Sequence, residues 1–272
     1  MLKHKKNVSP KNVSPLRYPG GKTRACKVIE AVLLQHFNMP DFDTLVSPFF
    51  GGGSFEFYLQ NKYHLHIQAN DKFTPLYNFW QQAKINSKAL CAALREVKTI
   101  NKEEFMNYRS TIMASETDIA TAVKYFIINR CSFSGATLSG GFSLEASVKR
   151  YTPSAIKRVE DLDLTAVDFH NVDFTEFLKD PANNKTLLFL DPPYYLDKKS
   201  KLYGHNGDMH ETFDHQQLFT MLQGQKKWLM TYNNCEYIKE LYKAYVIIEV
   251  GWSYGMNKSK ASSEIIILSK SV

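Results

Sequence analysis

Short apolar segments alternate with segments of helical periodicity along most of this chain, and this alternation constrains its fold more than any other feature. Six apolar runs that end in polar or turn residues predict strands, at residues 44–50, 64–71, 186–191, 227–232, 244–250 and 264–268. Apolar residues at helical spacing predict helices between them, at residues 23–37, 54–60, 213–223 and 236–242. Such alternation is typical of an α/β domain with a mostly parallel sheet. Only a loop joins the last two strands, so we expect an antiparallel hairpin there, because a parallel return needs a crossover helix.

Residues 75–163 interrupt this pattern. They are polar, their clearest helix falls at residues 119–129, and a Ser- and Gly-rich segment follows it. We expect an inserted helical subdomain at the edge of the sheet, with residues 16–74 and 164–272 forming the α/β domain. Residues 1–15 contain a short repeat of Lys-Asn-Val-Ser-Pro, and we interpret them as a flexible basic arm.

The composition favours a cytoplasmic protein with a polyanionic partner. A chain of 272 residues that is 44% hydrophobic can bury a sizeable core. It has no run of about 18 apolar residues, so we expect no membrane span, and no apolar run follows the N-terminal lysines as in a secretory signal. Its four cysteines form no Cys-x-x-Cys pair, which favours reduced thiols. With 34 basic and 27 acidic residues, the net charge of +7 favours binding to nucleic acid.

The most specific motif is Asp191-Pro192-Pro193-Tyr194, which directly follows an apolar run. Ligand sites of open α/β sheets lie outside the carboxyl ends of the strands. An exocyclic amine on an aromatic base is a poor nucleophile, because its lone pair is delocalised into the ring. The Asp191 carboxylate and the Pro192 carbonyl could accept its two N–H bonds and free that lone pair, while the prolines hold the carbonyl in place. Tyr194 offers a ring on which a flipped base can stack. A stiff turn that merely ends the strand is the alternative.

A glycine-rich loop, Phe49-Phe-Gly51-Gly-Gly53-Ser, lies at the end of the first predicted strand. Glycines let a backbone approach a ligand closely, but Glu56 replaces the last glycine of the dinucleotide fingerprint. Asp71 ends the next predicted strand about 20 residues later, where an acid usually binds ribose hydroxyls. Together the loop and the acid predict a site for an adenosine-containing cofactor.

A third motif, Arg17-Tyr18-Pro-Gly20-Gly21-Lys22, precedes the first predicted helix. Backbone N–H groups, the positive end of a helix dipole and a lysine can together cradle a carboxylate or a phosphate. The ring of Tyr18 could face a sulfonium cation. A plain N-terminal loop with a surface lysine is the alternative.

In this order, the three motifs resemble those of the Dam-type (alpha-group) DNA adenine methyltransferases, and the resemblance extends from residue 15 to about residue 270. It implies a Rossmann-like S-adenosylmethionine methyltransferase fold, with a seven-stranded mixed sheet and an inserted helical target-recognition subdomain. It also implies that residues 191–194 transfer a methyl group from S-adenosylmethionine to the 6-amino group of a flipped adenine in double-stranded DNA. The cofactor-binding residues that it implies are Tyr18, Gly20, Gly21, Lys22, Phe49, Gly51, Gly53, Asp71, Asp173 and Phe174.

Members of this family that methylate GATC carry Asn-Arg in the recognition hairpin, followed by Asn-Gly-Leu and another Arg. This chain has Asn129-Arg130, but Ser134 stands in place of the later Asn and no Arg is near, which predicts a different short site that contains adenine. Arg130 either contacts a guanine or braces the hairpin internally. The DNA contacts that we expect are Arg17, Asn129, Arg130, Ser132, Ser134, Lys198 and Lys199. The two lysines could equally belong to a solvated charge run.

Other interpretations stay open at this point. RNA adenine, the N(4) amine of cytosine or a protein glutamine could be the substrate of the same chemistry. A DNA-binding module on an inactive fold would usually have lost Asp191, Tyr194 or the glycines, which are all present. His205, His210 and His215 lack the spacing of metal ligands, so we expect no metal site. The oligomeric state is open, with a slight preference for a monomer, as is the presence of a partner restriction enzyme.

Overall fold

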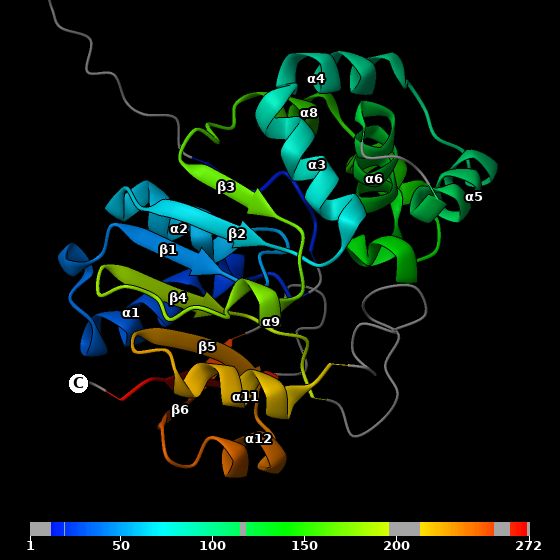
Figure 1. Ribbon diagram of the computed structural model, residues 1–272. Helices are drawn as coiled ribbons and strands as arrows, with labels where there is room; N and C mark the ends of the chain where they lie inside the picture. The colour runs from blue at the N-terminus through cyan, green and yellow to red at the C-terminus, as the bar shows by residue number, and fades with distance from the viewer. Residues whose placement is uncertain (1–11, 19, 115–117, 196–212, 253–261, 271–272) are drawn as a thin grey trace, which may run out of the picture.

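The computed structural model describes residues 12–18, 20–114, 118–195, 213–252 and 262–270, and its centre is a seven-stranded sheet (Figure 1). The strands are β1 Thr44–Ser47, β2 His66–Asn70, β3 Val167–His170, β4 Thr186–Leu190, β5 Trp228–Asn233, β6 Val246–Trp252 and β7 Ser262–Leu268. They lie in the order β3-β2-β1-β4-β5-β7-β6. The first five strands in this order are parallel, and β7 runs antiparallel to both of its neighbours.

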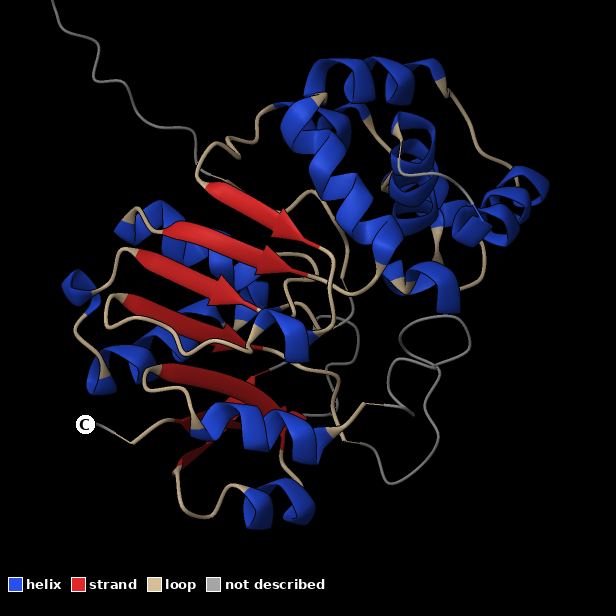
Figure 2. Cartoon of the chain, viewed as in Figure 1, coloured by secondary structure: helices blue, strands red, loops and turns tan. Residues whose placement is uncertain are grey.

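Helices cover both faces of the sheet (Figure 2). They are α1 Cys26–His36 and α2 Ser54–Tyr63 on one face, and α9 Phe174–Phe177, α11 His215–Gln223 and α12 Glu236–Leu241 on the other. Strand β4 is buried along its whole length. Leu187 and Phe189 belong to the core under α1 and α2, whereas Leu188 and Leu190 belong to the core under α11 and α12. Because a central parallel strand has no solvated face, β4 is apolar from Leu187 to Leu190 and is easily found in the sequence.

The alternating pattern predicted the sheet well, with one omission. The six strands expected from apolar runs are present, with ends shifted by a few residues, and the antiparallel hairpin of β6 and β7 is confirmed. The seven-stranded mixed sheet implied by the resemblance is also confirmed. Strand β3 was missed, because it lies at the edge of the sheet and needs apolar residues on only one face. Its Asp168 instead accepts hydrogen bonds from Lys84 and Gln68 and pairs with His66.

Beyond the β3 edge lies a group of helices that the middle of the chain forms (Figure 1). They are α3 Thr74–Ile85, α4 Ser87–Glu96, α5 Lys102–Thr111, α6 Ile119–Cys131, α7 Leu144–Lys149 and α8 Pro153–Glu160. Short 3-10 helices are Lys22–Arg24, Met39–Asp41, Ile112–Ala114, Phe133–Gly135 and Thr137–Ser139. The almost fully buried α6 is the centre of the group, and Trp80 of α3 stacks on Phe169 of β3 with ring centroids 5.8 Å apart, which joins the group to the sheet. None of the helices in the described ranges is long and apolar enough to cross a membrane.

The turn before α2 requires glycine at position 53, and this requirement can be tested. Gly53 has a φ of +65°, and a Cβ there would lie 2.4 Å from the buried ring of Phe50. We expect Gly53→Ala to lower the free energy of unfolding by more than about 1 kcal/mol, since both the backbone and the ring must shift. Gly141→Ala is the matched control, because a Cβ at Gly141 meets nothing within 4 Å. Denaturant titrations in which the two variants are equally stable would contradict this account.

Candidate active site

The residues expected to form a site gather where the parallel strands end. Asp71 follows β2, Asp191 follows β4, and the glycine-rich loop follows β1. Since β1, β2 and β4 are neighbours in the sheet, their carboxyl ends share one edge. The segment from Arg17 to Lys22 reaches the same edge, because Lys22 contacts Asp191 directly. Four stretches that are far apart in the sequence are thus brought together, in the place where open α/β sheets bind ligands.

The Asp191 carboxylate is held on both of its oxygens. Lys22 Nζ donates to Oδ2 at 2.7 Å, and Thr231 Oγ1 donates to Oδ1 at 2.7 Å. Lys22 also donates to the carbonyl of Gly20 at 2.8 Å, and only 3% of its side chain is exposed, against 23% for Asp191. Hydrogen bonds to ionised groups are strong and directional, so this arrangement fixes the orientation of the carboxylate. The contact between Lys22 and Asp191 was not expected from the sequence. The expectation that Lys22 binds a cofactor stays a prediction.

The ring of Tyr194 is fixed by residues from three parts of the chain. It stacks on Tyr232 with ring centroids 5.4 Å apart, and its hydroxyl donates to Glu264 at 2.7 Å. Lys22 Nζ lies 5.2 Å from the ring centroid, which places Tyr194 beside the ion pair. The hydroxyl of Tyr232 donates to the carbonyl of Pro193 and so holds the turn itself. Tyr194 is nevertheless partly exposed.

Two hydrogen-bond acceptors therefore remain at this turn for a substrate. Asp191 keeps lone pairs beyond those that Lys22 and Thr231 occupy, because each carboxylate oxygen can accept more than one bond. Among the described residues, no donor reaches the carbonyl of Pro192, whereas the next carbonyl is bonded to Tyr232. An ionised carboxylate and a rigid carbonyl can together accept both N–H bonds of an amino group.

Asp71 ties the glycine-rich loop to the end of β2. Its carboxylate accepts from the backbone N–H of Gly51 and from that of Phe73, both at 2.9 Å. Burial raises the pKa of Asp71 to about 6, although these two hydrogen bonds favour the ionised form. Such a carboxylate can still accept further bonds from hydroxyl groups, as an adenosine ribose would require.

Glycines of this loop and of the segment from Arg17 to Lys22 are required by packing within the protein. Gly51 has a φ of +51°, and a Cβ at Gly51 would lie 2.9 Å from the ring of Tyr18. A Cβ at Gly21 would lie 3.0 Å from the carbonyl of Tyr18, whose oxygen also accepts the N–H of Gly21. The predicted motifs around Tyr18 and Gly51 are therefore in direct contact. The glycines alone do not identify a ligand, because close packing inside the protein already accounts for them.

An aromatic group lies near Asp71 and could hold a planar base. The ring centroids of Phe49, Phe174 and Phe213 lie 5.2–5.7 Å from one another. Asp173 accepts from the N–H of Thr175 at the start of α9, and the ammonium of Lys72 lies 2.7 Å from it, which lowers the pKa of Asp173 against the effect of burial. The carboxylate of Asp71 could accept hydrogen bonds from hydroxyl groups, and the three rings could pack on a base. Together these residues fit an adenosine group.

Sequence reasoning missed Thr231, Tyr232 and Glu264. Their positions depend on the pairing of strands: Leu190 is opposite Met230, so the residues that follow, Asp191 and Thr231, are neighbours. Strand β7 lies beside β5 and brings Glu264 opposite Asn233. Polar residues at the ends of predicted strands were a usable signal, but only the order of the strands makes them partners.

Glu56 is a further acidic group close to the site. It lies in the first turn of α2, is 3% exposed and accepts a 2.7 Å hydrogen bond from Ser47. Burial raises the pKa of Glu56 to about 7, and the negative charge of Asp191 contributes to the increase. In the sequence Glu56 stood out only as a departure from a glycine fingerprint.

Three of the residues expected to contact DNA are buried in the structure, which does not favour that role for them. Asn129 and Ser132 are fully buried and Arg130 is 6% exposed. Asn129 exchanges hydrogen bonds with both backbone groups of Arg17, and Arg130 donates to the carbonyls of Arg150 and Pro15. Of the two roles left open for Arg130, the geometry supports the internal brace.

The other expected DNA contacts have varied positions. Arg17 is partly exposed and donates to the carbonyl of Ser132 at 3.1 Å. Ser134 is partly exposed in a tight turn with a φ of +59°. Lys198 and Lys199 lie outside the described residues, as do His205 and His210. Within the described ranges, no group of three or more His, Cys, Asp or Glu side chains could hold a metal ion.

Comparison with known proteins assigns the family. Residues 18–256 match the family model of the D12 class N6 adenine-specific DNA methyltransferases, a stretch that includes Lys22, Asp71 and residues 191–194. No curated protein matches the chain. The chain therefore belongs to the D12 class of N6 adenine-specific DNA methyltransferases.

Proposed function

We propose that residues 191–194 are the catalytic site of this DNA methyltransferase, and that they act on an adenine flipped out of double-stranded DNA. Methylation of the 6-amino group of adenine in DNA is the reaction of the family, and this favours DNA adenine over RNA, cytosine or glutamine. The observation that carries the assignment is the Asp191 carboxylate, which Lys22 and Thr231 hold beside the ring of Tyr194.

The turn acts on the amino group through its two acceptors. Asp191 accepts a hydrogen bond from one N–H group, and the carbonyl of Pro192 accepts a hydrogen bond from the other. The nitrogen lone pair is thereby freed from the adenine ring. Pro192 and Pro193 hold this geometry because their φ angles are restricted. Tyr194 stacks on the base, which must leave the stack of the duplex before it can reach this ring. Positioning and fixed dipoles supply most of the rate acceleration in this scheme.

The cofactor of methyltransferases in general is S-adenosylmethionine, which supplies an electrophilic methyl group when bound. In this chain Asp71 would accept the ribose hydroxyls, and the rings of Phe49 and Phe174 would enclose the adenine beside Asp173. The remaining contacts that we propose are Tyr18, Gly20, Gly21, Lys22, Gly51 and Gly53. The carboxylate–aromatic arrangement around Asp71 supports this set.

DNA recognition is the second part of the proposal. We assign it to the inserted residues 75–163, with Arg17, Ser134, Lys198 and Lys199 as contacts, because the catalytic turn must accept any adenine. The departures from the GATC-type motif favour another short target. A monomer in the cytoplasm stays our expectation for the working form of the enzyme.

The first prediction concerns Asp191. Asp191→Ala should reduce methyl transfer by a factor on the order of 100 or more, because one of two fixed acceptors is lost. Because this variant removes the carboxylate that the buried Lys22 contacts, Asp191→Asn is made as well; it keeps the shape and one acceptor oxygen. Transfer of labelled methyl groups to DNA is measured with cofactor and DNA binding as controls. Full activity in both variants would rule out Asp191 as the acceptor.

The second prediction concerns Thr231, whose hydroxyl bonds to Asp191 and to the carbonyl of Leu190. Thr231→Val keeps the shape of this fully buried side chain and removes its hydrogen bond to Asp191. A hydrogen bond to a charged group contributes about 1.5–3 kcal/mol, so kcat should fall roughly 10- to 100-fold with little change in DNA binding. Thr186→Val is the control, because Thr186 begins β4 at the end away from Asp191 and its hydroxyl bonds to Asn183. Equal kcat values for the two variants would contradict a positioning role.

The third prediction is a pH dependence of cofactor binding. An ionised carboxylate accepts hydrogen bonds from ribose hydroxyls more strongly than a protonated one, and Asp71 becomes protonated as the pH falls through about 6. Affinity for S-adenosylmethionine should therefore be constant above about pH 7 and weaken about 10-fold at pH 5, one unit below that pKa. Calorimetric titrations at both pH values measure this change. Asp71→Asn should bind weakly at both pH values without this step, and a wild-type affinity that is equal at both would place the ribose elsewhere.

A further inference from the structure

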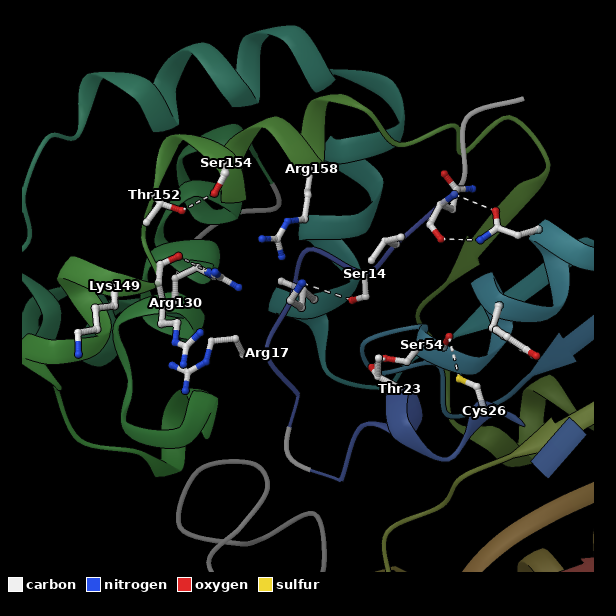
Figure 3. A pocket seen from close by; sticks show the side chains of 16 residues that line it. Ser14, Arg17, Thr23, Cys26, Ser54, Arg130, Lys149, Thr152, Ser154 and Arg158 are labelled. Atoms are coloured by element: carbon white, nitrogen blue, oxygen red, sulfur yellow. Dashed lines mark hydrogen bonds between the residues drawn. The ribbon is translucent and has the colours of Figure 1, made fainter. Parts of the chain in front are cut away.

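A cavity of about 550 Å³ lies between the helices beyond the β3 edge and the rest of the protein (Figure 3). One wall is formed by α7, α8 and the residues between them, including Arg150. The opposite wall is the chain from Asn12 to Arg17, together with Thr23 and Ser54 at the beginnings of two helical segments. Thr23 directly follows Lys22, so the cavity borders the segment that reaches Asp191.

The charge of this cavity is entirely positive. The lining contains five basic side chains and no acidic one: Arg17, Arg130, Lys149, Arg150 and Arg158. Lys149 pairs with Glu145, which lies outside the lining. The structure records no ion pair for the four arginines within its described ranges. A group of arginines without ion-pair partners is unfavourable by itself, and an anion would relieve the repulsion.

Burial and neighbouring positive charges lower the pKa of two of these arginines. The pKa of Arg130 is lowered to about 10, mainly by burial and then by the charges of Arg158, Arg17 and Arg150. Burial lowers the pKa of Arg17 as well, and Arg150 adds to this shift. The cavity therefore concentrates positive charge that the fold does not neutralise.

Two of the arginines are available to a ligand. Arg17 and Arg130 use guanidinium N–H groups to hold backbone carbonyls of Ser132, Arg150 and Pro15. Arg150 and Arg158 are exposed, and no hydrogen bond of their side chains is present among the described residues. Hydroxyl groups of Ser14, Thr152 and Ser154 lie in the same lining and can also donate. A planar guanidinium with several donors suits phosphate oxygens.

We propose that this cavity binds a backbone phosphate of the DNA substrate through Arg150 and Arg158. The proposal rests on the DNA methyltransferase function but not on the catalytic assignment of Asp191. A free nucleotide is a poorer fit, because the only aromatic side chain of the lining is Tyr58, whose hydroxyl is bonded to Glu30 and whose ring stacks with Phe55. Phosphate contacts position a protein on DNA without reading its sequence.

The test is the salt dependence of DNA binding. Duplex binding of wild type and of the double variant Arg150→Gln/Arg158→Gln is measured between about 50 and 200 mM salt. Each lost phosphate contact reduces the slope of log K against log salt by about 0.9, so a reduction of about 1–2 is expected. Affinity at low salt should fall about 10-fold or more, equally for duplexes of unrelated sequence. An unchanged slope would overturn the proposal.

Matched variants separate this effect from a general loss of charge. Lys185→Gln/Lys226→Gln removes two exposed charges that precede β4 and β5, outside the cavity and outside residues 75–163, and should keep a slope near that of wild type. Arg150→Lys/Arg158→Lys should restore most of the slope. If the Lys185 and Lys226 double variant loses as much slope as the arginine variant, the cavity has no special role.

Activity distinguishes this proposal from the catalytic one. At saturating DNA, Arg150→Gln/Arg158→Gln should keep the kcat of wild type, whereas Asp191→Ala should lose kcat but keep the wild-type slope. Thermal unfolding in inorganic phosphate, against sodium chloride of equal ionic strength, identifies the source of the ligand. If phosphate stabilises wild type but not the arginine variant, and the DNA slope is the same in both, the site binds free phosphate and the assignment to DNA fails.

Discussion

The ion pair of Lys22 and Asp191 is the interaction on which the site depends. Separating it would deprive an almost completely buried ammonium of the carboxylate that it contacts, which is unfavourable. The pair therefore holds the N-terminal segment against the end of β4. Because Tyr18 of that segment packs on Gly51 and Gly52, the glycine-rich loop is fixed by the same contact. Three motifs that look independent in the sequence are mechanically one unit.

The features that could be predicted are those that depend on residues adjacent in the sequence. A buried central strand such as β4 is apolar after its first residue, and the Asp-Pro-Pro-Tyr turn that follows it is chemically distinctive, so both were found. The partners of that turn could not be found, since Thr231 and Glu264 meet it only through the order of the strands. Strand β3 escaped notice for a related reason, because an edge strand with Asp168 facing Lys84 has no apolar run. The roles assigned to the site residues remain predictions.

Polar residues of the helices beyond the β3 edge show where reasoning from composition fails. Asn129 and Arg130 looked like contacts for DNA because their side chains carry suitable donors and acceptors. The same groups also satisfy buried backbone, and here they bond to the chain around Pro15 and Arg17. A buried polar group without a partner is costly, so such residues are as valuable inside as on a surface. The exposed Arg150 and Arg158, which no motif singled out, are better placed to meet a ligand.

The bond between Tyr194 and Glu264 has a consequence for the synthesis of the enzyme. Strand β7, which carries Glu264, is the last strand of the chain but lies inside the sheet, between β5 and β6. A ribosome releases the N-terminal motifs and the Asp-Pro-Pro-Tyr turn before this strand exists. Until residue 264 has emerged, the hydroxyl of Tyr194 lacks this acceptor and β5 lacks its antiparallel neighbour. The surroundings of the turn are thus completed only after β7, the last strand of the sheet, has been synthesised.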